Sequence, residues 1–225
     1  MKCASLKIQK QWDRHRRKWR RCERCGLSDS ATTKVFGKGS LPADILFIGE
    51  GPGKTEDLLG KPFLGLSGKI LKAWLRELNG RHSWCITNLV ACRPCDERGA
   101  RNRIPHGYEV RKCNERLRDI QALAQPRLVV LLGQSAATYY DPVNWNVPTL
   151  TRYHPSYILR QGGTTTQVNK RMVEVLLTGT RTHLEGAHAQ DRKNPKAVLE
   201  KDSKKPYGSG RKKYTAKPKP LSRKV

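Results

Sequence analysis

Long apolar runs are absent from this chain of 225 residues. No stretch of 18 apolar residues occurs, so no membrane-spanning helix is expected. The N-terminus lacks the apolar stretch of a secretory signal, and a disulfide framework is therefore not expected either. No internal repeat is present, and the absence of a GxxxxGK[ST] phosphate loop disfavours a nucleoside triphosphate site.

Acidic residues are scarce: 19 Asp and Glu stand against 45 Lys and Arg, which gives a net charge of +26. A surplus of this size indicates a polyanionic partner, either nucleic acid or an anionic membrane surface. Residues 1–21 carry nine Lys and Arg against one Asp, and residues 185–225 carry thirteen against four acids. We predict a basic, helical N-terminal segment over 1–21, a globular domain over 22–184 and a disordered basic tail over 185–225.

The middle of the chain alternates short apolar runs with stretches of helical spacing. The pattern predicts strands over residues 44–49, 83–90, 127–132 and 147–153. It predicts helices over residues 66–78, 105–124, 134–140 and 169–178. Strands that alternate with helices are typical of an α/β fold with a parallel sheet covered on both faces.

Chemically distinctive residues follow three of these strands. The first strand runs into Gly49–Gly53 (GEGPG), the second ends at Asn88, and His154 follows the fourth. Glycines let the backbone approach a ligand, and a side-chain amide offers one acceptor and two donors, as a pyrimidine edge requires. Each feature alone also fits a plain structural role, as a tight turn, a capping amide or a structural histidine. In such sheets, ligands bind beyond the carboxyl ends of the strands. Because all three features stand at these ends, we expect them to form a ligand-binding site together.

Phe63 stands between the first predicted strand and its helix, in the segment GKPFLG. An aromatic residue among proline and glycines fits either a core position or a platform on which a base stacks.

The seven cysteines include a C-x2-C pair, a third cysteine after 66 intervening residues and a fourth after 20 more. This set is Cys22, Cys25, Cys92 and Cys113. Four thiolates suit zinc or an iron–sulfur cluster, although the long gap between Cys25 and Cys92 does not fit a compact zinc finger. The C-x2-C pair alone also fits a redox pair. Cys95 stays open as a substitute ligand, and Cys85 is expected in the core.

The motifs occur in one order along the chain: C-x2-C, GEGPG-x2-ED, G-x-PFLG-x-SG, ITN, CRP, NR-x-P-x3-E-x3-C, VVLLG-x-SA and YHPSYILR. This set resembles the family 4 uracil-DNA glycosylases over roughly residues 20–180. The GEGPG form is closer to family 4 than to family 5. The resemblance implies a three-layer α/β/α sandwich with a short, mainly parallel four-stranded sheet.

The resemblance also implies an activity, a cofactor and a partner. The enzyme would be a DNA N-glycosylase of base excision repair that hydrolyses the N-glycosidic bond of flipped-out deoxyuridine. It would act as a cytoplasmic monomer on uracil-containing DNA, with no membrane partner. The four cysteines named above would hold a structural 4Fe–4S cluster. The loop over residues 95–101 is longer than usual for the family, and Cys95 stands where relatives commonly have proline.

Individual roles follow by resemblance. His154 would stabilise the negative charge on the leaving base. Glu50 would support the attacking water, because Gly51 occupies the position of the family 1 aspartate. Phe63 would stack on the base and Asn88 would pair with its edge. Substrate-binding backbone would come from Gly51 and Gly53, and Tyr157 and Ile158 would form the DNA wedge. Two alternatives stay open: a superfamily member for another modified pyrimidine, and a non-catalytic, metal-containing nucleic-acid-binding protein.

Overall fold

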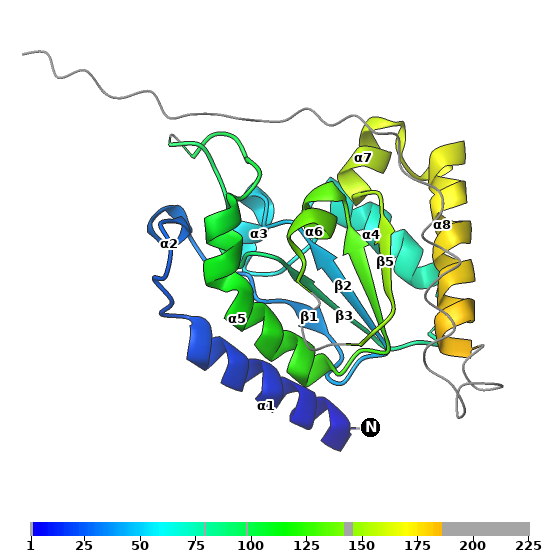
Figure 1. Ribbon diagram of the computed structural model, residues 1–225, viewed down its shortest axis with the longest axis horizontal. Helices are drawn as coiled ribbons and strands as arrows, with labels where there is room; N and C mark the ends of the chain where they lie inside the picture. Colours follow the sequence, from blue (N-terminus) through cyan, green and yellow to red (C-terminus); the bar gives the residue numbers. More distant parts are fainter. Residues whose placement is uncertain (1, 79, 98, 142–145, 186–225) are drawn as a thin grey trace, which may run out of the picture. The chain divides into compact units, whose positions relative to one another are not determined.

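A five-stranded sheet lies at the centre of the computed structural model (Figure 1). Its strands are β1 (Lys38–Gly39), β2 (Ile45–Gly49), β3 (Trp84–Asn88), β4 (Leu128–Leu132) and β5 (Thr149–Arg152). The spatial order is β1-β3-β2-β4-β5, with β1 antiparallel to β3 and the other pairs parallel. The structure describes residues 2–78, 80–97, 99–141 and 146–185.

The prediction of an α/β sandwich is confirmed. The predicted count of four strands is wrong, because the sheet has a fifth, short edge strand, β1. Its two residues contain no apolar run, so periodicity could not reveal them. The edge position is fixed instead by long-range contacts, among them the hydrogen bond from Trp12 Nε1 to the Gly39 carbonyl at 3.0 Å.

Helices cover both faces of the sheet (Figure 1). They are α1 (Lys2–Trp19), α2 (Leu27–Ser30), α3 (Lys54–Leu59), α4 (Leu66–Glu77), α5 (Gly107–Ala124), α6 (Gln134–Tyr139), α7 (Pro155–Arg160) and α8 (Gln167–Thr180), with short turns η1 (Gly163–Thr165) and η2 (Arg181–Glu185). Within the described ranges, no helix combines the length and the apolar character needed to cross a membrane.

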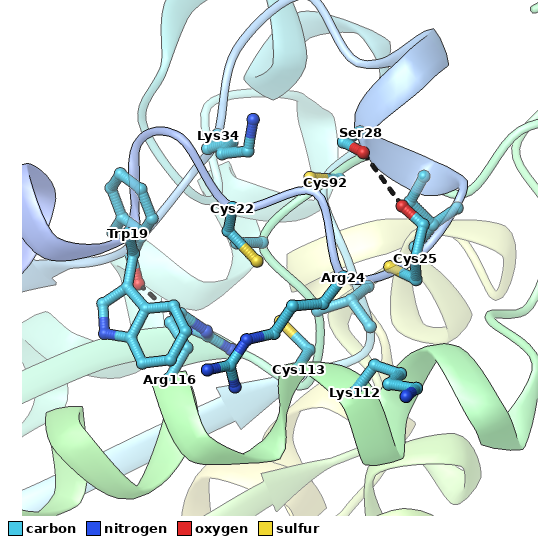
Figure 2. A pocket seen from close by; sticks show the side chains of 14 residues that line it. Trp19, Cys22, Arg24, Cys25, Ser28, Lys34, Cys92, Lys112, Cys113 and Arg116 are labelled. Carbon is cyan, nitrogen blue, oxygen red and sulfur yellow. Dashed lines mark hydrogen bonds between the residues drawn. The ribbon is translucent and has the colours of Figure 1, made fainter.

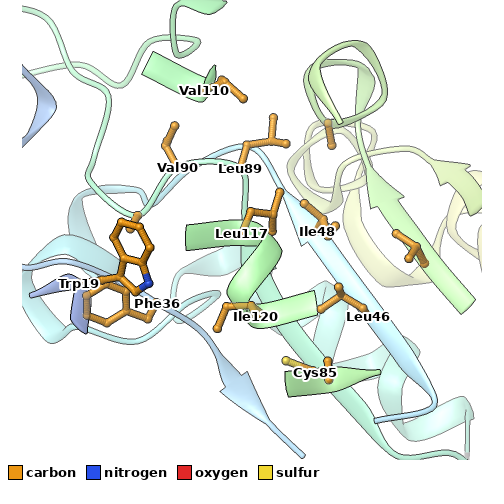
Figure 3. Close-up of a cluster of buried hydrophobic side chains, with 14 of the residues drawn as sticks. Trp19, Phe36, Leu46, Ile48, Cys85, Leu89, Val90, Val110, Leu117 and Ile120 are labelled. Carbon is orange, nitrogen blue, oxygen red and sulfur yellow. The ribbon is translucent and has the colours of Figure 1, made fainter. Parts of the chain in front are cut away.

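Side chains of the central strand β2 alternate between two apolar layers, as the period of a strand requires. Leu46 and Ile48 pack with residues of α1, α5 and α6 on one face (Figure 3). Ile45 and Phe47 pack with residues of α4, α7 and α8 on the other. All four are fully buried, so β2 reads as one continuous apolar run in the sequence.

The basic N-terminal segment contributes to the first of these layers. Over 1–21, the helix α1 buries Trp12 and Trp19, which pack in the same cluster as Phe36. Trp19 Nε1 also donates a hydrogen bond to Asp119 of α5 at 2.7 Å. The segment therefore shares its core with the globular part. Residues 1–188 form one unit by their contacts, and the predicted tail lies outside the described residues beyond Glu185.

The parallel strands end level with one another. Gly49 pairs with Asn88 across β2 and β3, and Leu132 pairs with Arg152 across β4 and β5. The order of the parallel strands reverses between β2 and β4, and in open α/β sheets ligands bind at such a switch point. The loops that follow these four residues therefore meet around one crevice.

A buried arginine fixes the end of β3. Arg116 of α5 is 1% exposed, and its guanidinium donates to Thr87 Oγ1 at 2.8 Å, to the Asn88 carbonyl at 2.5 Å and to the Leu89 carbonyl at 3.0 Å. It forms no ion pair with any described carboxylate. These hydrogen bonds satisfy acceptors that the sheet leaves unpaired where the strand ends.

Replacing Arg116 by Met should lower the free energy of unfolding by about 2–4 kcal/mol, because several buried acceptors lose their donor together. Urea unfolding followed by circular dichroism measures the change. The control is Arg118→Met on the same helix, since Arg118 is exposed and pairs with Asp141 at 3.3 Å. It should cost less than about 1 kcal/mol. Equal effects of the two substitutions would contradict the structural role of Arg116.

Candidate active site

A cavity of about 600 Å³ opens at the carboxyl edge of the sheet, between the loops that follow β2, β3, β4 and β5. Its lining includes every residue that was predicted from the sequence to bind the base or to take part in bond cleavage. These are Glu50, Gly51, Gly53, Phe63, Asn88 and His154.

Phe63, Asn88 and His154 meet around a common space. The rings of Phe63 and His154 lie 6.0 Å apart between centroids, at an interplanar angle of 31°. Gly49 separates the Asn88 amide from the Phe63 ring, and a Cβ atom on Gly49 would lie 2.7 Å from Phe63 Cζ. Only glycine fits there. Phe63 itself has a φ of 53°, a left-handed conformation that is costly for a bulky residue and typical of functional sites.

Asn88 presents an unused acceptor to this space. The residue is only 2% exposed, and its Oδ1 atom is buried without a hydrogen-bond partner in the described structure. Buried polar atoms are nearly always paired in folded proteins, so an unpaired one at a cavity wall indicates a donor that arrives with a ligand.

His154 caps the N-terminus of α7. Its Nδ1 atom accepts the Ser156 N–H at 3.2 Å and lies 2.6 Å from Ser156 Oγ. Burial, with a smaller effect of the Arg160 charge, lowers the pKa of His154 to about 4. The ring is therefore neutral at pH 7, and because Nδ1 accepts, Nε2 carries the proton. Gly133 allows the close approach, since a Cβ atom there would lie 2.9 Å from His154 Cβ.

The cavity lining contains two carboxylates with different surroundings. Glu56 is buried and accepts the N–H groups of Gly53 at 3.1 Å and of Leu64 and Gly65 at 2.8 Å. It thereby ties the glycine-rich loop to the segment that carries Phe63. Glu50 makes no side-chain hydrogen bond or ion pair with the described residues. Glu56 was not among the predicted site residues, although a glutamate three residues after a helix N-cap is a capping signal.

Since Glu56 accepts the N–H of Gly53, this backbone group is already occupied. Gly53 contributes to the cavity wall, but its N–H is not free to contact a bound base. Gly51 lines the same wall against Pro94 and Val90, where a Cβ atom would lie 3.0 Å from each of the two side chains.

Next to the glycine-rich loop, part of the lining comes from a loop between β3 and α5 that was not among the predicted site residues. Asn102 and Arg103 line the cavity there, together with Pro94. Arg103 binds Glu109 through two hydrogen bonds of 2.9 and 2.6 Å, and Arg93 Nε donates to Asn102 Oδ1 at 2.6 Å. These contacts hold the loop in one conformation against the site.

The predicted wedge residues lie on α7. Ile158 is 0% exposed and packs in the apolar cluster with α4 and α8, so insertion into DNA would require its side chain to leave this cluster. Its side chain lies on the side of α7 that packs against α4 and α8. Tyr157 is half-buried, and its ring stacks on Tyr153 with centroids 4.6 Å apart.

A second cavity gathers the four cysteines that the spacing selected (Figure 2). Cys22 and Cys25 follow α1, Cys92 follows β3, Cys113 lies on α5, and all four line this one cavity. Its cationic lining residues are Arg24, Lys34, Lys112 and Arg116. Within the described part of the chain, no three Cys, His, Asp or Glu side chains are close enough to hold a single metal ion.

The remaining described cysteines lie elsewhere. Cys95 does not line the four-cysteine cavity, and its thiol lies 3.7 Å from Ser30 Oγ. Cys85 is fully buried in the core, and burial raises the pKa of its thiol to about 12, which makes it inert. No described cysteine forms a disulfide.

Comparison with known proteins identifies the family. Residues 36–177 match the model of the uracil DNA glycosylase superfamily. A type-4 uracil-DNA glycosylase of Saccharolobus solfataricus is 39% identical over 53% of this chain and 54% of its own length. Those of Archaeoglobus fulgidus and Thermotoga maritima are 34% and 33% identical, over 61% and 63% of this chain and 78% and 79% of their own lengths. The chain therefore belongs to the uracil DNA glycosylase superfamily and, within it, to the type-4 uracil-DNA glycosylases.

Proposed function

We propose that this protein is a DNA N-glycosylase that removes uracil from DNA in base excision repair. The relatives of A. fulgidus and T. maritima, named as type-4 uracil-DNA glycosylases, are matched over more than three quarters of their length. The observation that carries the proposal is the buried, unpaired Oδ1 of Asn88 beside the rings of Phe63 and His154. A flat base with a donor on its edge is the ligand that this combination suits.

Recognition follows from the Asn88 amide. Its free oxygen accepts the N3–H of uracil, and its NH₂ group donates to the adjacent O4. Cytosine presents an acceptor and a donor in the reverse order, so both hydrogen bonds would be lost and buried polar groups would face each other unpaired. Mismatches of this kind discriminate strongly between substrates. Phe63 supports the ring by stacking.

The target base reaches the cavity by leaving the DNA stack, at a cost of a few kcal/mol. The net charge of +26 favours the phosphate contacts that hold the strand during this step. With Ile158 buried, Tyr157 stays a predicted wedge residue.

In the chemical step, the C1′–N1 bond breaks and its electron pair remains on the uracil ring. The Nε2–H of neutral His154 donates a hydrogen bond to the oxygen on which this charge collects, as in an oxyanion hole. A water molecule bonds to C1′, and the proton that it loses passes through solvent to the uracil anion, so that neutral uracil is released. We assign Glu50 to orient this water, because Glu56 is already occupied by three backbone N–H groups.

The four-cysteine cavity suits a 4Fe–4S cluster, which we propose as the cofactor. Thiolates are the ligands such clusters require, and the cationic lining complements their negative charge. Bound there, the cluster would cross-link the turn after α1, the loop after β3 and α5.

We further propose that the protein acts inside the cell, where DNA lies and thiols stay reduced, and that it acts as a monomer.

The protein should release uracil from a uracil-containing oligonucleotide, detected as strand cleavage after alkali treatment. His154→Ala should lower turnover by about 100-fold, since one charge-stabilising donor is lost. Glu50→Ala should lower it as well, while both variants keep their affinity for DNA.

Glu77→Ala is the matched control, because Glu77 is exposed at the end of α4 and outside the cavity. It should behave as the wild type. Wild-type turnover in both active-site variants would overturn the residue assignment, and absence of uracil release by the wild type would overturn the proposed function. Parallel assays with other modified pyrimidines identify a different substrate.

The acid limb of the turnover–pH profile should lie near pH 4, because burial holds the pKa of His154 at about 4. Above that pH the ring is neutral and Nδ1 accepts the Ser156 N–H; below it, a proton on Nδ1 faces this donor and disrupts the arrangement. His154→Gln keeps an N–H donor that does not titrate, so the contribution of His154 to the limb should disappear, and any limb that remains belongs to the Glu50 carboxylate. A limb near the ordinary histidine value of about 6.5 contradicts the assignment.

Cys92→Ser should reduce the iron and sulfide bound per chain, because Cys92 lines the four-cysteine cavity. Cys95→Ser is the matched control three residues away, and should keep a full complement of iron. Metal analysis of anaerobically purified protein provides the measurement. If only the Cys95 variant lost iron, Cys95 and not Cys92 would be the ligand. If the protein bound zinc and no iron, the proposed 4Fe–4S cluster would be wrong.

A further inference from the structure

A second cavity shares Phe63 with the active-site cavity and takes no part in the proposed chemistry. This cavity of about 530 Å³, here called the α4 groove, is formed by α4, β1 and β3. Its apolar floor includes Leu71, Leu75, Trp84 and Ile86. Its rim carries Lys38, Lys69, Lys72 and Arg76, and no acidic residue is found among its described lining residues. Phe63 lines both this groove and the active-site cavity.

Three of the basic residues form a stripe along one side of α4. Lys69, Lys72 and Arg76 follow the spacing i, i+3, i+7, which spans about 10 Å of helix axis. All three are exposed, and none makes a hydrogen bond or an ion pair with the described residues. A row of uncompensated cations above an apolar floor complements a chain that carries anions at regular intervals and flat apolar rings.

Lys38 adds a fourth cation from the opposite side of the groove. It is half-buried on the edge strand β1, and burial together with the nearby charge of Lys72 lowers its pKa. The positive charges therefore crowd one another, and an anion bound between them would relieve the repulsion.

Trp84 supplies an aromatic surface at the start of β3. Its side chain is half-buried, and Gly39 packs against it so closely that a Cβ atom there would lie 3.0 Å from Trp84 Cε3. The indole is thus held in position at the wall of the groove. Basic grooves that contain aromatic rings bind single-stranded nucleic acid without sequence preference.

We propose that the α4 groove binds single-stranded DNA next to the flipped uridine, with phosphates on the basic stripe and a base against Trp84. This inference rests on the proposed function, because the uridine occupies the other cavity that Phe63 lines. The strand then passes Phe63 on its way from one cavity to the other. The groove lengthens the contact with the substrate strand and takes no part in bond cleavage.

The test compares two triple variants that each remove three positive charges. K69Q/K72Q/R76Q alters the groove, and K7Q/K10Q/R17Q alters exposed residues of α1 as the matched control. Binding to a fluorescein-labelled, uracil-free single-stranded oligonucleotide is measured by anisotropy at several salt concentrations. The groove variant should bind at least about 10-fold more weakly at low salt, with a salt slope smaller by about 2, and the control less than about 3-fold.

Equal weakening in the two triple variants would mean diffuse electrostatic binding and would overturn the proposal. Tryptophan emission gives a local readout: single-stranded DNA should quench it in the wild type, and Trp84→Phe should lose part of this quenching. Thermal unfolding of each variant separates lost binding from lost folding. Unchanged quenching in Trp84→Phe would also overturn the assignment.

Catalysis separates this proposal from the proposed function. In the groove variant, KM for a long single-stranded uracil substrate should rise about 10-fold with kcat unchanged, whereas a uracil-containing trinucleotide should react as with the wild type. If the groove variant releases uracil with the KM of the wild type, the proposed DNA-binding role of the groove is wrong and the proposed function stands. If the wild type binds single strands through the groove but releases no uracil, only the proposed function fails.

Discussion

The site depends on a buried cation at the junction of α5 and β3. The guanidinium of Arg116 donates to the carbonyls of Asn88 and Leu89 and to the Thr87 hydroxyl. The same residue lines the four-cysteine cavity, one helical turn after Cys113. One set of hydrogen bonds therefore connects the proposed cluster site with the backbone of the residue proposed to recognise the base. Because a buried guanidinium tolerates little displacement, the end of β3 is held rigidly.

A buried carboxylate has the corresponding role on the other side of the cavity. Glu56 accepts three backbone N–H groups, from the glycine-rich loop and from the segment after Phe63. Without this carboxylate, the N–H groups would bind water instead, and the two loops would not be held at a fixed distance from each other. Together, Arg116 and Glu56 fix the two loops between which a planar ligand would fit, and so preorganise the site before substrate binds. Catalysis by His154 benefits from the same rigidity, since its ring is oriented by the Ser156 N–H.

Much of this arrangement could be predicted from the sequence. The alternation of apolar runs and helical spacing predicted the parallel sheet. Since the carboxyl ends of parallel strands lie at one edge of a sheet, the sequence also predicted that Gly49, Asn88 and His154 stand at the same edge. The cysteine spacing selected the four thiols that the structure gathers around one cavity. The missed features share a physical cause. The strand β1 has two residues and no periodicity, and the burial of Ile158 depends on which side of α7 meets α4 and α8.

The sequence by itself determined which residues could do chemistry and at which end of the sheet they would stand, because strand period and glycine-rich turns are local properties. Only the tertiary structure decided what those residues contact. It left Asn88 Oδ1 without a partner, occupied Glu56 with backbone donors and lined the α4 groove with cations from both α4 and β1. Contacts of this kind join residues far apart in the chain, and no local pattern encodes the distance between them.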